Sequence, residues 1–334
     1  MKFWKHCLLG AAALLCMRIP ASSQTLNWSS PVINNPAMGT AGGSYERPGV
    51  STAIFNGEIW AAFTTKSCSG SDCYMILANT TGGTSTTFEN FRDIYISSSF
   101  GYAMSNQNPA LVDTNGKLWL TWVDSSNHHY IASSADGEHW DFIGDVIDAP
   151  TTVYSPSVAV NPSNPDIIYI GYMNSVYHTP VLCTYDTTNA NNQSCQNLTN
   201  LRTMNFNPGM AFFQGELYMG FEDRGNSHCL YFYKYNLSNN GFTFWNPASC
   251  NEQTSTAPSL ATFNNDLYIA FRTNDSSQKF TVLVTTNGSD WGYRQQPGWA
   301  MDGPPDLLDL NPTQNTMMNA FVRSNHLQTS IGSL

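Results

Sequence analysis

A short cassette occurs six times along this chain of 334 residues, and no other feature constrains the fold as strongly. Each copy has a proline, an apolar stretch, a turn often built on Gly or Asn, and an aromatic residue within a second apolar run. The copies begin at Pro48, Pro109, Pro156, Pro208, Pro258 and Pro305, with steps of 61, 47, 52, 50 and 47 residues. A period of this size, with hairpin signals in each unit, indicates stacked or radially arranged β units.

Four short strands can be traced within a repeat. In the second repeat we expect strands at 109–113, 118–123, 129–134 and 140–146. Turns at Asn115-Gly116 and Asp136-Gly137 join them, and the fifth repeat has a corresponding turn at Asn287-Gly288. These pairs favour hairpins because both residues tolerate positive φ. Four antiparallel strands form one propeller blade, so the sequence predicts an all-β, six-bladed β-propeller of four-stranded antiparallel blades.

The last repeat lacks its fourth strand. It ends after a strand at Leu327–Ile331, whereas the segment Trp28–Ile33 reads like a fourth strand without a sheet. Pairing of the two segments would close the ring and remove exposed sheet edges; the alternative is an open array with ragged ends. We predict one propeller domain, 24–334, whose last blade is closed by the N-terminal strand. Its blades are expected near 45–100, 105–148, 154–205, 206–253, 256–300, and 303–334 plus 25–34.

Residues 1–23 have the pattern of a secretory signal peptide. Lys2 and Lys5 precede an apolar run of 11 residues, which is too short to span a bilayer, and Ala21-Ser22-Ser23 offers a cleavage site. A lipoprotein anchor at Cys16 is the alternative, although the preceding Leu15 is large for that motif. We therefore predict a secreted protein, extracellular or periplasmic, without a membrane span.

The charge balance argues against a nucleic-acid partner. Charged residues make up 11% of the chain, against about 25% in typical soluble domains. The net charge of −10 becomes −13 when cleavage removes Lys2, Lys5 and Arg18. Binding to phosphates needs a basic face, so at this net charge we do not expect a nucleic-acid partner. A surface rich in Asn, Ser, Thr and Gly instead suits polar, uncharged ligands.

Six cysteines remain after the predicted cleavage. They fall in three pairs, each within one repeat: Cys68 with Cys73, Cys183 with Cys195, and Cys229 with Cys250. In an exported protein, three local disulfides are the economical interpretation. Zinc is the weaker alternative, because the spacings are not C-x2-C and the histidines show no partner pattern. No cofactor and no catalytic metal are expected, and structural calcium is left open.

Two turns carry a resemblance to a known family. The segments Ser134-Ala-Asp136-Gly137-Glu-His-Trp140 and Thr285-Thr-Asn287-Gly288-Ser-Asp-Trp291 resemble the Asp-box turns of sialidase-like six-bladed β-propellers, and Asn239-Asn240-Gly241-Phe-Thr-Phe244 is a looser copy. In that family the turns are structural: the Asp or Asn caps its own turn and the Trp packs between blades. The resemblance covers essentially the whole chain after residue 23. It concerns architecture, because sialidases, other glycosidases and lectins share such scaffolds.

Propeller topology indicates which face would carry function. The loops between blades lie on the same face as the loops that join the second strand of a blade to the third. The loops between blades bring Arg47 to this face, because Arg47 directly precedes the cassette proline Pro48. The loops after the second strands bring the residues Asp124, Glu222, Asp223, Arg224, Arg272 and Arg323. The loop tips differ from blade to blade, which favours one central site over six equivalent ones.

The resemblance also implies roles for these residues. Sialidases hold the substrate carboxylate with three arginines, because Arg forks bind carboxylates in a bidentate manner. Here Tyr45-Glu46-Arg47-Pro48 resembles the family's Arg-x-Pro motif with one residue missing. Arg47, Arg224 and Arg323 would form the triad, with Arg272 and Asp223 as further substrate-binding residues. Asp124 and Glu222 would be the catalytic carboxylates, with Asp72 as an alternative acid.

Structural roles compete with each of these assignments. Arg47 could be a solvated residue before a strand, and Glu222-Asp223-Arg224 could form an ion pair at the rim. Arg272 could lay its stem across its strand, and Asp124 could cap its loop. We therefore predict a monomeric, carbohydrate-recognising propeller whose partner is a glycan or glycoconjugate. The candidate activity is that of an exo-acting sialidase or related glycoside hydrolase. The alternative is a noncatalytic lectin or a cell-surface protein-interaction propeller.

Overall fold

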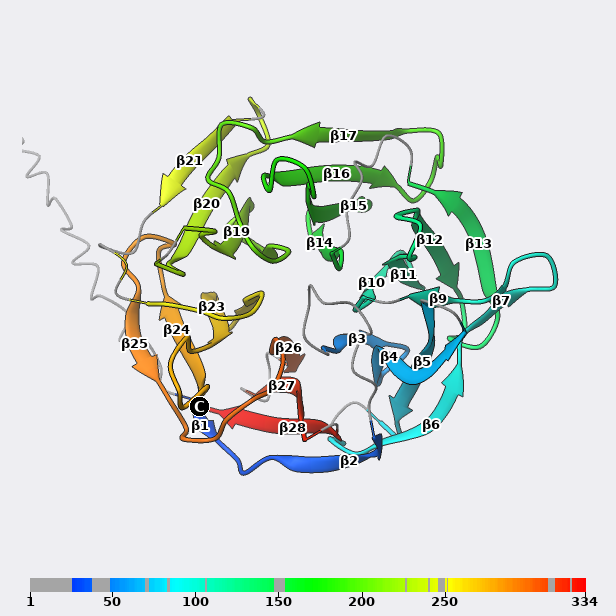
Figure 1. Cartoon of the computed structure of the whole chain (residues 1–334), viewed down its shortest axis with the longest axis horizontal. Coiled ribbons are helices and arrows are strands. Elements are labelled where there is room, and N and C mark those ends of the chain that lie inside the picture. The colour runs from blue at the N-terminus through cyan, green and yellow to red at the C-terminus, as the bar shows by residue number, and fades with distance from the viewer. Residues whose placement is uncertain are drawn as a thin grey trace, which may run out of the picture.

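Six four-stranded antiparallel sheets stand around a central axis as the blades of a β-propeller (Figure 1). The computed structural model describes residues 26–37, 49–69, 72–82, 85–105, 107–146, 154–225, 227–239, 241–245, 250, 252–311, 316–324 and 326–334. Within these ranges the chain forms strands and no helix, so none of them contains a helix that could cross a membrane. The predicted signal peptide and Arg47 lie outside the described residues. The predicted fold class is confirmed.

Each blade runs outward from the axis in chain order. The first contains β3 (Ser51–Phe55), β4 (Glu58–Ser69), β5 (Asp72–Thr80) and β6 (Phe88–Asp93). The second contains β10 (Ala110–Thr114), β11 (Lys117–Val123), β12 (His129–Ser134) and β13 (Trp140–Asp145). The third contains β14 (Ser157–Asn161), β15 (Asn164–Met173), β16 (Pro180–Asp186) and β17 (Gln193–Asn197).

The second half of the ring repeats this order. The fourth blade contains β18 (Gly209–Phe213), β19 (Glu216–Glu222), β20 (Leu230–Asn236) and β21 (Gly241–Trp245). The fifth contains β22 (Ser259–Phe263), β23 (Asp266–Arg272), β24 (Phe280–Thr285) and β25 (Gly292–Gln295). The sixth contains β26 (Asp306–Asn311), β27 (Thr316–Arg323) and β28 (His326–Ser333). Five of the cassette prolines thus directly precede an innermost strand, and Pro48 stands three positions before Ser51, where β3 begins.

One insertion departs from the repeat. Between the first and second blades, β7 (Tyr95–Ser97) and β8 (Gly101–Tyr102) form a small hairpin, and β9 (Met104–Ser105) pairs with β5. This insertion accounts for the longest step between prolines. Its aromatic side chains pack on neighbouring rings: Phe100 stacks on Phe142 with centroids 4.4 Å apart. The extra length is visible in the sequence, but no periodic signal there predicts the hairpin.

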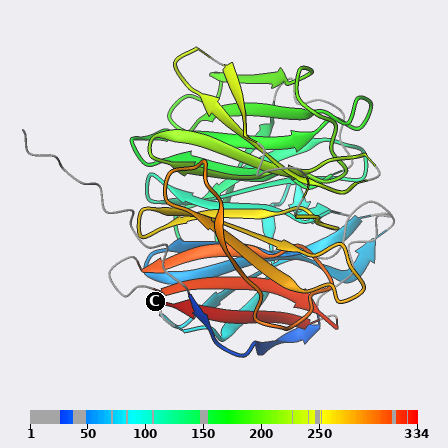
Figure 2. The ribbon, with the colours of Figure 1, turned by 90° about the vertical axis from the view of Figure 1, so that its left-hand side faces the viewer.

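The N-terminal segment closes the ring, as predicted. Residues of β1 (Asn27–Trp28) and β2 (Val32–Ala37) pair antiparallel with β28, with Trp28 opposite Gly332 and Ile33 opposite Gln328. Figure 2 shows these blue strands lying beside the red strands of the last blade. The segment also joins both neighbouring blades. The Trp28 indole donates to Gln295 Oε1 at 3.1 Å, and Asn34 Oδ1 accepts from Phe88 N at 2.9 Å.

Turn geometry fixes the spacing between blades. Asp136 Oδ1 accepts from the amides of Glu138 and His139, each at 2.8 Å. Asn287 Oδ1 accepts in the same way from Ser289 and Asp290, also at 2.8 Å. The glycine in each turn has positive φ and touches an aromatic side chain of the preceding blade. Gly137 lies against Trp60 and Gly288 against Tyr218, so close that a Cβ atom would lie 2.1 Å from the nearest ring or hydroxyl atom.

Two predicted disulfides are present. Cys183–Cys195 joins β16 to β17, and Cys229–Cys250 joins the start of β20 to the segment after β21. Cys68 and Cys73 are opposite each other in the β4–β5 register. The side chain of Cys68 lies outside the described residues, so the bridge between these two cysteines stays a prediction.

Gly137→Ala tests the contact between turn and neighbouring blade. The added methyl group meets a rigid indole at a residue with φ of 79°, so we expect a loss of about 3 kcal/mol from strain and overpacking together. Gly116→Ala is the matched control, because Gly116 has φ of 67° and open space around it. Its expected cost is about 1 kcal/mol. Urea unfolding measures both, and equal losses would show that the Trp60 contact adds nothing.

Asn34→Ala tests ring closure. Asn34 is buried, and its amide nitrogen donates to Thr329 Oγ1 at 3.2 Å while its oxygen binds the first blade. Truncation leaves the Phe88 amide without its acceptor, so we expect the free energy of unfolding to fall by about 1–3 kcal/mol. Thermal and urea unfolding measure this loss. An unchanged unfolding curve would mean that this contact does not stabilise closure.

Candidate functional site

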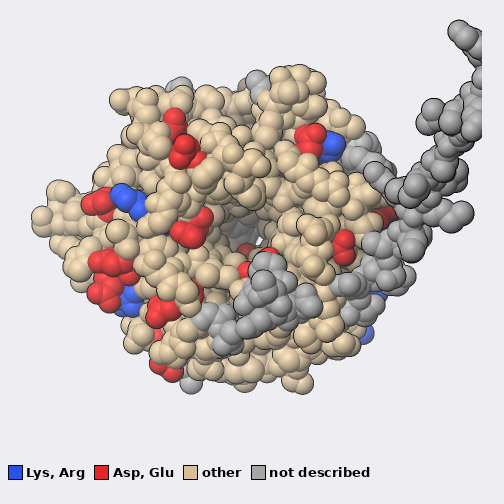
Figure 3. All heavy atoms as spheres, turned by 180° about the vertical axis from the view of Figure 1, so that it is seen from behind, with Lys and Arg blue, Asp and Glu red and all other residues tan. Residues whose placement is uncertain are grey.

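The innermost strands surround an axial channel. It encloses about 860 Å³, including its open end, and every blade contributes to its wall. The residues directly before five cassette prolines line it: Asn108, Ser155, Asn207, Ala257 and Pro304. Figure 3, which views the side opposite to Figure 1, shows an opening at the centre with acidic atoms at its edge. The loops between blades thus bring these residues to the axis.

The position after each cassette proline breaks the sixfold pattern. Five blades have a small residue there: Gly49, Ala110, Ser157, Gly209 and Ser259. Space explains the smallest of them, since a Cβ atom on Gly209 would lie 2.3 Å from the carbonyl oxygen of Pro258 in the next blade. The sixth blade has Asp306 instead. Among the described residues that line the channel, Asp306 is the one with a charged side chain.

Asp306 is held by the first blade. Its Oδ2 accepts from both the backbone amide and the hydroxyl of Thr52, each at 2.6 Å. Burial in the channel wall raises the pKa of Asp306 to about 7, although the two Thr52 hydrogen bonds favour the ionised form. Near neutral pH the channel therefore holds a carboxyl group that can both donate and accept a proton.

Hydrogen bonds between blades fix the other polar groups of the wall. Asn108 Oδ1 accepts from Gly49 N at 2.7 Å, and Ser155 Oγ accepts from Asn108 N at 2.9 Å. Ser259 Oγ accepts from Leu307 N at 3.0 Å on the opposite part of the ring. These contacts leave little rotational freedom to the side chains at the mouth. The wall is therefore a preorganised polar surface.

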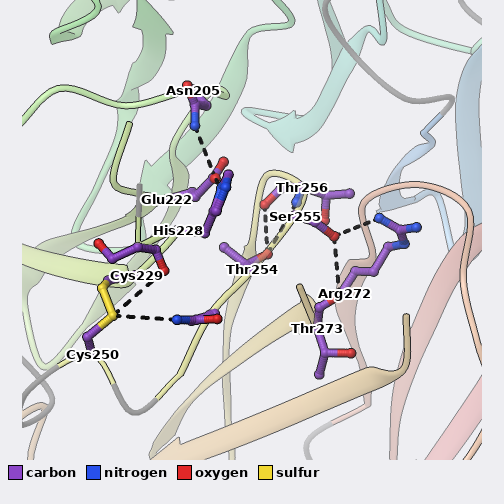
Figure 4. A network of polar contacts seen from close by, with 12 residues as sticks. Asn205, Glu222, His228, Cys229, Cys250, Thr254, Ser255, Thr256, Arg272 and Thr273 are labelled. Carbon is purple, nitrogen blue, oxygen red and sulfur yellow. Dashed lines mark hydrogen bonds and ion pairs between the residues drawn. A yellow bond between two sulfur atoms is a disulfide. The ribbon is translucent and has the colours of Figure 1, made fainter. Parts of the chain in front are cut away.

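Glu222 ends β19 and is fully buried, with 0% of its surface exposed. Asn205 Nδ2 donates to its Oε1 at 3.1 Å, and His228 Nδ1 contacts the same oxygen. Its Oε2 is buried and makes no hydrogen bond to a described residue. Burial raises the pKa of Glu222, and the contacts with His228 and Asn205 oppose this shift. Figure 4 shows the pair beside Asn205.

Arg272 occupies the equivalent position at the end of β23 in the next blade. It is 1% exposed, and it donates from Nε to the Met301 carbonyl at 2.8 Å and from Nη1 to Ser255 Oγ at 2.6 Å. Met301 and Ser255 belong to the two loops that flank the fifth blade at the mouth. The guanidinium thus fastens two loops between blades to one strand (Figure 4).

The remaining described site residues lie outside the channel wall: Asp124, Asp223 and Arg224 are in loops, and Arg323 ends β27. Asp124 Oδ1 accepts from the amides of Ser126 and His128, at 2.8 and 2.9 Å, and so caps its own loop. Asp223 lies 3.9 Å from Arg202. Arg224 and Arg323 are exposed. Burial lowers the pKa of His178, and the charge of Arg224 adds to this shift.

Glu222 and Asp223 are adjacent at the end of β19, whereas the described arginines Arg224, Arg272 and Arg323 belong to three different blades. None of the predicted site residues within the described ranges is among those that line the channel. Their functional assignment stays a prediction. Sequence reasoning missed Asp306. A signal was available, since it is the acidic residue at a cassette position that is small in the other five copies.

The described residues contain no group of three or more His, Cys, Asp or Glu side chains arranged to hold a metal ion. The candidate site comprises the carboxyl of Asp306 and the hydroxyl and amide groups of the channel wall.

Comparison with known proteins supports the architecture. No model of a known protein family matches the chain, and no curated protein is significantly similar in sequence. Among solved structures, Penicillium chrysogenum α-L-arabinanase complexed with arabinobiose is similar, with a TM-score of 0.66 at 13% identity over 91% of this chain and 98% of that chain. A subtype N11 neuraminidase-like protein of A/flat-faced bat/Peru/033/2010 (H18N11) gives a TM-score of 0.59 at 11% identity over 92% and 94%. Aleuria aurantia lectin in complex with α-methyl-L-fucoside gives a TM-score of 0.57 at 11% identity over 85% and 90%. At these identities the similarities establish the fold alone.

Asp306 should make stability depend on pH. Between its ordinary pKa of about 4 and its raised value of about 7, the folded protein binds a proton that the unfolded chain has released. The free energy of unfolding should therefore fall as the pH rises through this window. Urea titrations across the window measure the slope for the wild type and for Asp306→Asn, which keeps an acceptor for Thr52. The slope should be shallower in the variant, and parallel slopes would contradict the shift.

Proposed function

We propose that this protein is a secreted carbohydrate-recognising propeller with one axial site. The observation that carries the proposal is the channel mouth, where amide and hydroxyl groups surround the single carboxyl of Asp306. Sugars are recognised by several convergent hydrogen bonds to such groups, on a preorganised surface. The similar arabinanase and lectin structures were solved with saccharides, which supports the same ligand class here. The two disulfides are consistent with an extracellular location.

A single site follows from the broken symmetry. Six equivalent sites would need the same contact residues in each blade. Here the position after the cassette proline is acidic in one blade and small in the others. The strand ends equivalent to Glu222 also differ, since Val123, Met173 and Arg272 occupy them in other blades. We therefore propose one ligand per chain, bound on the propeller axis.

Glycoside hydrolysis is the second candidate, and the raised pKa of Asp306 favours it. A carboxyl that retains its proton near neutral pH can protonate the leaving oxygen of a glycosidic bond. Hydrolysis also requires a second carboxylate, for which Glu222 and Asp124 are the sequence-based candidates. A sialoside is the finer proposal for the substrate, with Arg47, Arg224 and Arg323 as the carboxylate-binding arginines and Arg272 and Asp223 nearby.

Blocking the channel tests recognition. Asn207 is half-buried at the mouth and has no side-chain hydrogen bond within the described residues, so Asn207→Trp should fill the site without breaking a contact. We expect binding on a glycan array to fall at least about tenfold, a loss of about 1.4 kcal/mol. Asp141→Asn, on the outer strand of the second blade, is the control and should bind as the wild type does. Equal binding by Asn207→Trp would remove the axial site from the proposal.

Asp306→Asn distinguishes catalysis from binding. If Asp306 is the general acid, the variant should lose hydrolysis of a bound glycoside by a factor of about 100 or more, while wild-type activity falls as the pH rises above about 7. Sialosides and neutral glycosides serve as the two substrate sets. Binding without turnover of either set would leave the lectin function. Binding of no glycan at all would leave a protein-interaction propeller.

A further inference from the structure

A second hollow lies at the junction of the fourth and fifth blades. It spans about 490 Å³, with the open solvent at its mouth included, and its wall consists of Cys250, Glu252, Gln253, Thr273, Asn274, Asp275 and Arg294. We call it the outer hollow. Six of these seven side chains carry hydrogen-bonding groups. The outer hollow is formed by the loop between the two blades, the loop after β23 and the outermost strand β25.

The charges in the outer hollow are nearly balanced. Arg294 Nε lies 3.7 Å from Glu252 Oε1, and Glu252 is largely covered while Arg294 is half-exposed. Burial raises the pKa of Glu252, and Arg294 opposes the shift. Asp275 Oδ1 accepts from Ser277 N at 2.9 Å and from Gln278 N at 3.1 Å, so its own loop already occupies it.

This lining suits a neutral, hydroxyl-rich ligand. A metal cation would meet the guanidinium of Arg294, and a strongly anionic ligand would meet two carboxylates. Carboxylate, amide and guanidinium groups instead present pairs of donors and acceptors that can bind adjacent hydroxyl groups. The exposed side chain of Gln253 and the half-buried side chain of Asn274 supply such groups at the edge of the outer hollow.

One loop connects the outer hollow to the axial channel. Gln253 lines the outer hollow, and Ala257, four residues later, lines the channel. Four residues span about 14 Å at most. The two hollows therefore lie close together on the same face, separated by the stretch 254–256. A single sugar unit cannot occupy both, whereas an oligosaccharide of several units can.

Hydrogen bonds hold the connecting loop from both sides, and Figure 4 shows the contact of Ser255 with Arg272. Toward the fourth blade, Thr254 N donates to the His228 carbonyl at 3.0 Å. Toward the fifth blade, Ser255 N donates to the Arg272 carbonyl at 3.1 Å, and Asn274 N donates to the Gln253 carbonyl at 3.2 Å. The disulfide Cys229–Cys250 anchors the segment just before the loop. The distance between the two hollows is therefore set before any ligand binds.

We propose that the outer hollow is a second sugar-binding subsite, so that the ligand of the axial site is a neutral oligosaccharide several units long. The proposal rests on the proposed function and specifies its substrate class, as an alternative to the sialoside of the hydrolase candidate. One end of the glycan occupies the axial channel, and a later unit binds Gln253, Asn274 and Arg294. Buried Glu222 and Arg272 act as positioning residues, because they hold the loops that keep the two subsites in register.

The test measures binding against glycan length. Isothermal titration calorimetry measures the Kd of the wild type and of three variants. The ligands are neutral saccharides of increasing length, beginning with a single sugar unit. The series is chosen from those that the wild type binds on an array, with arabino-oligosaccharides as the first probe. We expect the longer ligands to bind wild type at least about tenfold more tightly than the disaccharide, the scale of one or two added hydrogen bonds.

Two variants remove the outer subsite in different ways. Gln253→Ala removes an exposed side chain, and Arg294→Lys keeps the charge beside Glu252 but loses the planar fork. In both, the preference for long over short ligands should shrink to about twofold or less. Gln196→Ala, an exposed glutamine on the outer strand of the third blade, is the matched control and should keep the full preference. Circular dichroism melting curves show whether each variant is folded.

The outcomes separate the two proposals. A wild type whose affinity does not depend on length, or variants that keep the preference, would overturn the outer subsite and leave the axial site intact. Tighter binding of anionic than neutral oligosaccharides of equal length would overturn the assignment to neutral glycans. Failure of the wild type to bind any glycan would overturn the proposed function and the subsite together.

Discussion

Closure of the ring is the constraint on which the rest of the structure depends. The first and last described strands belong to one sheet, so the sixth blade is complete only when the two ends meet. The axial channel is defined by six innermost strands, and the one carboxyl among its described lining residues stands on a strand of that closing blade. Asp306 binds Thr52 of the first blade, so the candidate site itself crosses the seam where the chain closes. Loss of closure would therefore disturb the site as well as the fold.

The repeat in the sequence predicted the blades because its signals are local. Proline before the innermost strand, Asn-Gly at the first turn, and apolar alternation are each decided by backbone sterics and burial within one blade. The turn at Asn115-Gly116 has positive φ at both residues, as such pairs favour. The hairpin of β7 and β8 was not predicted, because it occurs once and is stabilised by contacts such as Phe100 with Phe142, which are distant in sequence.

The site was harder to predict because charge alone does not say where a side chain points. Glu222 and Arg272 stand at the strand end that topology assigned to the functional face. Both are buried, since loops between blades fold over them and supply hydrogen-bond partners. Asp306 was overlooked because it follows a proline at the start of an apolar strand, where one acidic residue interrupts the apolar pattern without indicating a site. Comparing the six copies position by position, instead of looking for clusters of charge, would have identified it.

Burial of opposite charges at equivalent positions of adjacent blades has a mechanical consequence. Leaving a buried ionisable group without partners is costly, so Glu222 and Arg272 strongly favour loop conformations that supply them. Asn205 donates a hydrogen bond to Glu222, while Ser255 and Met301 accept hydrogen bonds from Arg272. The three loops that join the third blade to the sixth are thereby held by buried side chains of the strands. The residues on the solvent side of these loops can differ from one loop to the next. A propeller that binds one ligand on its axis needs this combination. The strands repeat to build the ring, whereas the loops must be both rigid and unlike one another to recognise a ligand that has no sixfold symmetry.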